Sequence, residues 1–152
     1  SPNSNFEIFF YGSFIPLQGI DVILRAAKIL ESDSLLHFTI LGGGQTEPEM
    51  KKLAEELNLK NVTFKPFAPM EELPGSINNS DLCLGIFGVS EKTQRVIPHK
   101  VLDYLACGKK VLTARTPGIL EKYENDERVI LCNAGDAEDL AEKIKSTAQS
   151  QS

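Results

Sequence analysis

One short stretch rich in charged side chains offers the clearest chemistry in this sequence. Lys92, Arg95, His99 and Lys100 fall within nine positions, and Asp103 follows Lys100 by three residues. Residues three apart share a helix face, so Lys100 and Asp103 would present a cation and a carboxylate together. Cations suit a diphosphate, and a carboxylate accepts hydrogen bonds from a ribose diol. The stretch therefore predicts a nucleotide site, with a solvated charged loop as the alternative that composition alone favours.

Two glycine-containing turns follow apolar segments and precede helical patterns. The first turn begins at Gly12 and ends at Gly19, and the second is the glycine run 42–44. Glycine lets the backbone approach a ligand closely, and the N-terminus of a following helix presents free N–H groups to an anion. Neither turn has the spacing of a dinucleotide-binding GxGxxG or of a P-loop, so both of those folds are disfavoured. The alternatives are a plain packed loop at the first turn and a flexible turn at the second.

Segments typical of buried strands alternate with segments of helical periodicity along the chain. The predicted strands are 6–11, 36–41, 62–64, 81–87, 110–113 and 129–131, and the predicted helices are 19–30, 47–58, 70–78, 101–106 and 137–146. This alternation predicts an α/β fold, a Rossmann-like, doubly wound parallel sheet of about six strands. Ligands bind such sheets beyond the carboxyl ends of the strands. Both glycine turns and the charged stretch follow predicted strands, so they should meet at that edge.

The composition fits one globular domain and disfavours several other classes of protein. The chain has 152 residues, 41% of them hydrophobic and 24% charged, with a formal net charge of −5, which argues against nucleic-acid binding. Cys83, Cys107 and Cys132 lie far apart among apolar or small neighbours, which predicts buried thiols in a reducing compartment. Two histidines without a ligand cluster predict no metal site.

The sequence also predicts where the domain lies and in which compartment it works. No apolar run reaches the roughly 20 residues of a membrane span, and no signal-peptide pattern is present, so we expect a cytoplasmic protein. Residues 1–5 are expected to be an edge or linker, 6–148 the single domain, and 149–152 a polar tail. From these polar ends we expect the sequence to be part of a longer chain.

The segment VIPHKVLDYLACGKKVLTARTPGILE resembles the donor-site segment of the group 1 retaining glycosyltransferases. That family commonly shows a Pro-x-Lys-x-x-Glu-Tyr-x-Ala-x-Gly-Lys-Pro-Val pattern, which the block from Pro98 to Gly108 follows. FFYGSFIPLQGIDVILRAAKIL is similar to the family's first strand, phosphate loop and helix, and FTILGGG to its second strand and glycine turn. NVTFKPFAPMEELPGSINNSDLCL is similar to its base-contacting loop and following strand. The resemblance covers nearly all of the chain and implies one half of a GT-B enzyme.

The resemblance implies roles for individual residues. Asp103 matches a glutamate that holds the ribose hydroxyls, although it is one methylene shorter. Arg95 stands where the family has a glutamate that engages the donor sugar. Val96 and Ile97 match a loop whose backbone N–H groups meet the diphosphate and sugar, and Phe67 matches the loop that meets the nucleobase.

Two residues of the first glycine turn depart from the family pattern. Ser13 and Gln18 stand where many relatives place an arginine and a lysine that neutralise the diphosphate. A diphosphate leaving group needs stabilisation of its charge in the transition state. We therefore hypothesise that Lys92, Arg95 or Lys100 replaces the missing pair from the other wall of the site.

The resemblance implies a C-terminal domain that binds a UDP- or GDP-linked sugar, with the acceptor on an N-terminal domain of the same chain. The full-length enzyme would be a hexosyltransferase-type glycosyltransferase that acts with retention and needs no metal or other cofactor. This domain alone would be inactive, and the N-terminal domain could contact a membrane peripherally. The sequence assigns no catalytic residue, and acid–base catalysis by His99 is disfavoured.

Two other functions compete with this one. A non-catalytic, nucleotide-binding regulatory module is favoured by the absence of cations at Ser13 and Gln18. A receiver-type signalling domain is disfavoured, because the predicted strand ends carry no acidic cluster.

Overall fold

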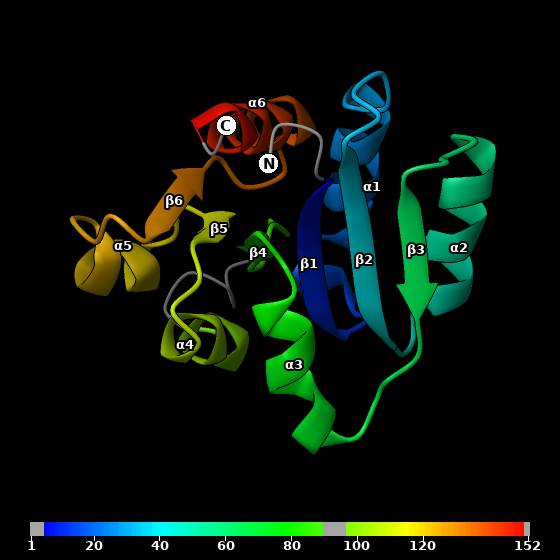
Figure 1. Cartoon of the computed structure of the whole chain (residues 1–152). Coiled ribbons are helices and arrows are strands. Elements are labelled where there is room, and N and C mark those ends of the chain that lie inside the picture. The colour runs from blue at the N-terminus through cyan, green and yellow to red at the C-terminus, as the bar shows by residue number, and fades with distance from the viewer. Residues whose placement is uncertain (1–4, 90–96, 151–152) are drawn as a thin grey trace.

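The computed structural model describes residues 5–89 and 97–150 and contains a six-stranded parallel sheet (Figure 1). The strands are β1 (Phe6–Ser13), β2 (Leu36–Gly43), β3 (Val62–Lys65), β4 (Leu82–Leu84), β5 (Val111–Ala114) and β6 (Val129–Cys132). Their order is β3-β2-β1-β4-β5-β6, so the direction in which strands are added reverses between β1 and β4. The predicted doubly wound parallel sheet is confirmed.

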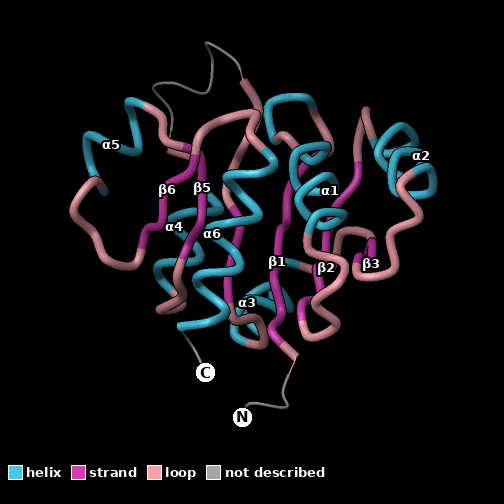
Figure 2. Tube along the Cα trace, turned by 90° about the horizontal axis from the view of Figure 1, so that it is seen from above, coloured by secondary structure: helices cyan, strands magenta, loops and turns pink. Residues whose placement is uncertain are grey.

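Helices cover both faces of the sheet. They are α1 (Ile20–Ile29), α2 (Glu47–Glu56), α3 (Leu73–Asn78), α4 (His99–Ala106), α5 (Pro117–Tyr123) and α6 (Ala137–Ser150), with short 3-10 turns at Pro16–Gln18 and Met70–Glu72. Figures 1 and 2 show α1 and α6 on one side of the strands and α3 and α4 on the other.

Each face of the sheet has its own hydrophobic core, because successive strand residues point to opposite faces. Phe10 of β1 packs in one core with residues of α1 and α6, among them Ile144. Its neighbour Phe9 packs in the other core with residues of α3, α4 and α5, among them Tyr104 and Ile119. Burial of each such side chain stabilises the fold by about 1.5–3 kcal/mol. Burial on both sides explains why β1 is almost continuously apolar.

Helix α5 is absent from the helices that the sequence predicts, because Thr-Pro-Gly at residues 116–118 is typical of a turn. Pro117 lies in the first turn of α5, where a missing backbone N–H costs little. Thr116 caps the helix, since its Oγ1 accepts a hydrogen bond from the backbone N–H of Ile119 at 3.3 Å. The Thr-Pro pair therefore begins a helix here, and the following Gly118 is buried against the core.

Most element boundaries lie within two residues of the prediction, and the C-terminal ends of β4 and α6 differ by more. Strand β4 ends at Leu84, whereas the apolar run predicted a strand to Phe87. Helix α6 continues to Ser150 rather than ending at Ser146. The N-terminus of α6 is capped, since the Asp136 carboxylate accepts a hydrogen bond from the backbone N–H of Asp139 at 2.9 Å.

The cysteines largely follow the prediction of buried thiols. Cys83 and Cys132 are buried and Cys107 is half-buried, and all three are free. Burial raises the pKa of Cys83 to about 11 and that of Cys132 to about 12, so both remain protonated at neutral pH. Across residues 5–89 and 97–150, no helix has the length and apolarity of a bilayer span, and no three potential ligand side chains gather to hold a metal.

Candidate nucleotide-sugar site at the carboxyl edge of the sheet

The two glycine turns lie next to each other, as the sequence predicted. Gly12 of β1 pairs with Gly42 of β2, and Phe14 donates a backbone hydrogen bond to Gly43 at 2.9 Å. A Cβ added to Gly42 would lie only 2.0 Å from the carbonyl oxygen of Gly12. The chain therefore needs glycine at this position, and main chain forms this part of the edge.

The first turn is also fixed from the β4 side. The N–H of Phe87 donates to the carbonyl of Gln18 at 3.0 Å, and the N–H of Gly135 donates to the carbonyl of Phe87 at 2.8 Å. Gly19 has a left-handed φ of 71°, and a Cβ there would lie 2.4 Å from the backbone nitrogen of Gly88. The loops that follow β1, β4 and β6 are thus joined through one residue, Phe87.

Helix α4 carries Lys100 to the end of β1. The Lys100 side chain is buried, with 6% of the residue exposed. Its Nζ lies 4.2 Å from the centre of the Phe10 ring and donates a hydrogen bond to Oε1 of Gln18. A Cβ on Gly12 would lie 2.6 Å from that same Nζ. The ammonium group therefore contacts the first glycine turn, from a helix that lies far along the sequence.

Lys100 has no carboxylate partner among the described residues. Its amine faces an aromatic ring and a neutral amide, which compensate only partly for lost hydration. Burial lowers the pKa of Lys100 to about 7, because desolvation disfavours the charged form. An anion that entered beside Gly12 would supply the missing counter-charge.

Asp103 lies one turn further along α4 and behaves differently from Lys100. It is exposed, and its Oδ2 accepts a hydrogen bond from the hydroxyl of Tyr11, the residue that precedes Gly12. Burial and the bond to Asp103 raise the pKa of Tyr11 well above its ordinary value, so this hydroxyl stays protonated. Although the two residues lie three apart on one helix, Lys100 is buried and Asp103 is exposed. Both side chains nevertheless meet the end of β1.

The structure brings some of the remaining predicted residues into this cluster and leaves others apart. Ser13 is exposed at the end of β1, Gln18 is half-buried beside Lys100, and Ile97 is half-buried just before α4. Phe67 is 57% exposed in the loop after β3, which is two strands away from β1. Arg95, Val96 and Lys92 lie outside the described residues.

A shallow depression borders the first glycine turn on the other side. Its volume is about 410 Å³, and Ile15, Thr46, Val89 and Gly135 contribute to its lining. A larger depression of about 640 Å³ lies over the charged loop between α5 and β6. That loop precedes β6 and so lies at the amino edge of the sheet, away from the glycine turns.

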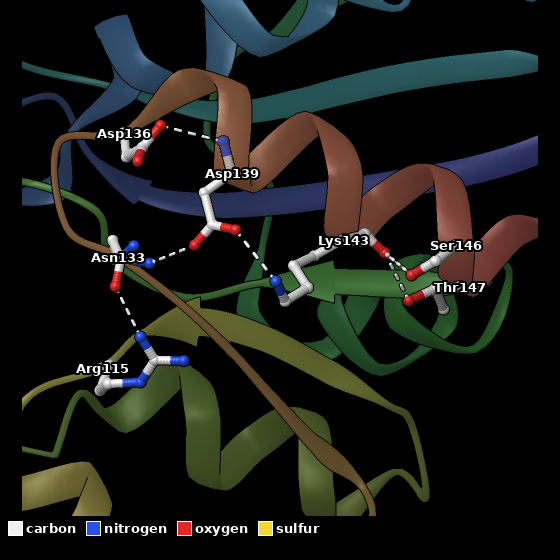
Figure 3. A network of polar contacts seen from close by, with 7 residues as sticks. All are labelled: Arg115, Asn133, Asp136, Asp139, Lys143, Ser146 and Thr147. Atoms are coloured by element: carbon white, nitrogen blue, oxygen red, sulfur yellow. Dashed lines mark hydrogen bonds and ion pairs between the residues drawn. The ribbon is translucent and has the colours of Figure 1, made fainter.

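The loops after β5 and β6 carry a second group of charges, drawn in Figure 3. Arg115 donates to Oδ1 of Asn133 at 2.5 Å, and the backbone N–H of Asn133 donates to Oδ2 of Asp139 at 2.8 Å. Lys143 donates to Oδ1 of Asp139 at 2.9 Å. The bonds from Asn133 and Lys143 lower the pKa of Asp139, and Asp139 raises the pKa of Lys143. Here the cations already have partners.

A family model described as glycosyl transferases group 1 matches residues 1–152. The chain belongs to this family. It is 28% identical over 114 residues to a putative colanic acid biosynthesis glycosyl transferase, WcaI, of Escherichia coli K12, covering 74% of this chain and 28% of that protein. It is 26% identical over 153 residues to WcaL of the same organism, covering 98% of this chain and 37% of that protein. The chain thus spans about a third of these relatives' length.

Solved glycosyltransferase structures share the fold of this domain. The catalytic domain of cholesterol-α-glucosyltransferase from Helicobacter pylori superposes with a TM-score of 0.81 at 21% identity, covering 97% of this chain and 89% of that one. Anabaena HepE, solved with UDP-glucose, gives 0.82 at 18% identity, covering 97% and 40%. The resemblance to group 1 glycosyltransferases and to a Rossmann-like domain of the GT-B fold is confirmed.

Sequence reasoning missed three residues of this glycosyltransferase domain's edge. Phe10 and Tyr11 are the last aromatic residues of an apolar strand, and Tyr104 lies within an apolar helix, so the sequence pattern predicts only core positions for them. The hydroxyl of Tyr104 donates to the carbonyl of Leu84 at 2.9 Å. A tyrosine in an apolar segment is a signal, because its hydroxyl needs a polar partner when it is buried.

Proposed function

We propose that this glycosyltransferase domain binds a nucleotide diphosphate sugar, UDP- or GDP-linked, at the carboxyl edge of its sheet. The observation that carries the proposal is the buried ammonium of Lys100 against the backbone of Gly12. A cation without a carboxylate partner, next to main chain that lacks side chains, is complementary to a diphosphate. The presence of UDP-glucose in HepE, which has the same fold, supports this class of donor.

Other residues of the edge would each contact a different part of the donor. The turn formed by Gly12, Ser13 and Gln18 would lie along the diphosphate together with Lys100. Asp103 would accept hydrogen bonds from the ribose hydroxyls. Its Oδ2 already accepts a hydrogen bond from Tyr11, so Oδ1 would take the main part in this contact. The base would stack near Phe67, whose exposed ring supports this role. Arg95, Val96 and Ile97 would meet the sugar.

We propose further that the full-length protein transfers the sugar with retention of configuration to an acceptor held by an N-terminal domain. Departure of the nucleotide diphosphate leaves negative charge on its oxygens, while the sugar becomes oxocarbenium-like. The Lys100 ammonium would stabilise the leaving charge, which is the task that a metal ion performs elsewhere. We therefore expect transfer to continue when divalent metal is removed by a chelator.

Thermal unfolding of this domain with UDP, GDP, ADP and their sugars tests the donor site. One base should raise the melting temperature, since a ligand at a hundredfold excess over its Kd stabilises the folded state by about 2.7 kcal/mol. Asp103→Ala should weaken binding by about tenfold if two ribose hydrogen bonds are lost. Glu127→Ala removes an exposed carboxylate at the amino edge, so it is the matched control and should bind as the parent does. Failure of every nucleotide to stabilise the domain would refute the proposal.

A second candidate is a non-catalytic, nucleotide-binding regulatory module. The neutral side chain of Gln18 in the diphosphate turn is the observation that favours it. An activity assay of the full-length protein distinguishes the two candidate functions. A regulatory module would bind the nucleotide sugar without transferring or hydrolysing it.

A further inference from the structure

Among residues 5–89 and 97–150, no charged side chain pairs with Lys100 and holds its amine in one protonation state. Nζ meets the Phe10 ring, the amide oxygen of Gln18 and the backbone of Gly12, all of which are neutral. This is the reverse of the usual arrangement, in which a buried lysine pairs with a carboxylate. The amine can therefore change its charge without breaking an ion pair.

The titratable groups on the elements around Lys100 do not supply a partner either. On β1 the nearest such group is Tyr11, and on α4 they are His99, Asp103 and Tyr104. Tyr11 and Asp103 bond to each other, and Tyr104 bonds to the backbone of β4. No ion pair to Lys100 occurs in the part of the chain that the structure describes. With a pKa lowered to about 7, Lys100 is partly neutral in the free domain near physiological pH.

We propose that Lys100 takes up a proton when the donor diphosphate binds, so that the domain binds nucleotide sugar and proton together. The inference rests on the proposed donor site. A diphosphate beside Gly12 would lie against the amine and favour its charged form. The proton comes from the solvent and forms a fourth bond to Nζ, and no bond of the donor breaks in this step. The binding reaction itself thus charges the cation that later stabilises the leaving group.

Gln18 is the neighbour that allows Lys100 to change its charge. Its amide oxygen positions the amine and leaves the charge of Lys100 free to respond to the ligand. A glutamate at this position would keep Lys100 protonated and would also repel the diphosphate. Gln18→Glu is therefore expected to remove proton uptake and to weaken donor binding by at least tenfold.

The pH dependence of binding follows from proton linkage. Below about pH 6 the amine is already protonated, so binding should take up little further proton. At pH 7 the uptake should be about half a proton per donor, and above pH 8 it should approach one. Affinity should fall about 25-fold between pH 6.5 and 8.5, because the protonated fraction of free Lys100 falls across that interval.

Calorimetry of this domain with UDP-glucose and with GDP-mannose tests the coupling. Titrations at pH 6.5, 7.5 and 8.5, in buffers with different ionisation enthalpies, report the number of protons taken up. These donors suit the test because their diphosphates are esterified at both ends and do not titrate near neutral pH. Binding whose heat is independent of the buffer at pH 7.5 and 8.5 would overturn the inference while leaving the donor site intact. If neither UDP-glucose nor GDP-mannose binds, both the proton coupling and the proposed donor site are overturned.

Three variants assign the proton to one amine. Lys100→Arg should bind with no proton uptake and no fall in affinity up to pH 8.5, because arginine remains charged. Lys100→Met should bind about 10–100-fold more weakly, also without uptake. Lys122→Met is the matched control, since Lys122 is an exposed lysine whose Nζ also lies over a ring, 5.6 Å from the centre of Tyr123. It should take up protons as the parent does. Proton uptake that persists in Lys100→Arg would assign the effect to another group and contradict the proposal.

Discussion

Two parts of the carboxyl edge treat their cations in opposite ways. Beyond β5 and β6, Lys143 pairs with Asp139, and the pKa of Lys143 is raised by that pairing (Figure 3). Beyond β1, Lys100 is buried among neutral groups, and its pKa is lowered to about 7. The first cation has a carboxylate partner, whereas the second has none in the described ranges 5–89 and 97–150. The difference supports the proposed donor site beside Lys100 and a structural role for the charges on α6.

The largest expected effect is on stability, when alanine replaces a glycine in the loop after β1 or in the loop after β6. Gly19 and Gly135 have similar left-handed φ values, 71° and 68°. A Cβ on Gly19 would lie 2.4 Å from backbone, whereas on Gly135 it would lie 2.7 Å from a methyl group of Val89, a residue that is 80% exposed and can move. Gly19→Ala should lower the free energy of unfolding by about 2–4 kcal/mol, and Gly135→Ala by about 1 kcal/mol. Chemical denaturation measures both, and equal losses would contradict the contrast.

The second prediction concerns the energetic cost of burying Lys100. Its pKa falls from 10.5 to about 7 on folding, so between these values the unfolded chain binds the additional proton. The stability of the parent should therefore rise with pH across this window, and the full cost should be present below pH 7. Lys100→Met should raise the free energy of unfolding at pH 6 by about 1–3 kcal/mol, with a smaller gain at pH 9. Urea titrations at both pH values test this, and a variant less stable than the parent at pH 6 would contradict it.

The third prediction concerns the paired charges of the β6 edge. Asp139→Asn should lower the free energy of unfolding at pH 7 by about 1 kcal/mol, since it weakens the bonds from Lys143 and from the Asn133 backbone. The pKa of Asp139 is lowered below its ordinary 3.8, so its contribution is present above that value and is lost as the pH falls through the lowered pKa. The difference between parent and variant should therefore vanish in strong acid. Glu142→Gln, an exposed change on the same helix, should leave stability unchanged.

The smallest effect is expected at the hydroxyl of Tyr11. Tyr11→Phe removes a surface hydrogen bond to Asp103 and should change the free energy of unfolding by less than about 0.5 kcal/mol. Donor affinity should fall by about two- to fivefold, because the Asp103 carboxylate loses the contact that orients it. A thermal-shift titration compares the two effects. Unchanged affinity would mean that Asp103 is oriented without Tyr11.

The sequence predicts the sheet well because the signal for buried parallel strands is local. Apolar runs such as residues 36–41 are continuous, and the glycines that end them mark the carboxyl edge. It fails at α5, because Thr-Pro-Gly is typical of a turn, although the Thr116 cap and Pro117 in the first turn also fit a helix start. The helix is further stabilised by packing of Ile119 and Tyr123 in the core. It also predicts a strand that is too long after Asp81, because hydrophobicity continues past the point where pairing ends.

The candidate site is predictable as a location and much less as an arrangement. The motif around Pro98 identified Lys100 and Asp103, and the strand order brought them to Gly12. Which way each side chain points depends on contacts with residues more than 80 positions away, Gln18 for Lys100 and Tyr11 for Asp103. No local pattern encodes such contacts. The neutral surroundings of the Lys100 amine, on which the proton coupling depends, therefore appear only in the folded chain.

The position of Phe87 has a consequence for the thermodynamics of ligand capture. Its backbone joins Gln18 to Gly135, so the main chain around the first glycine turn is held by hydrogen bonds before any ligand arrives. A loop that is already ordered loses little conformational entropy when a molecule settles on it. The heat of donor association should consequently be offset by only a small entropic penalty from this part of the backbone.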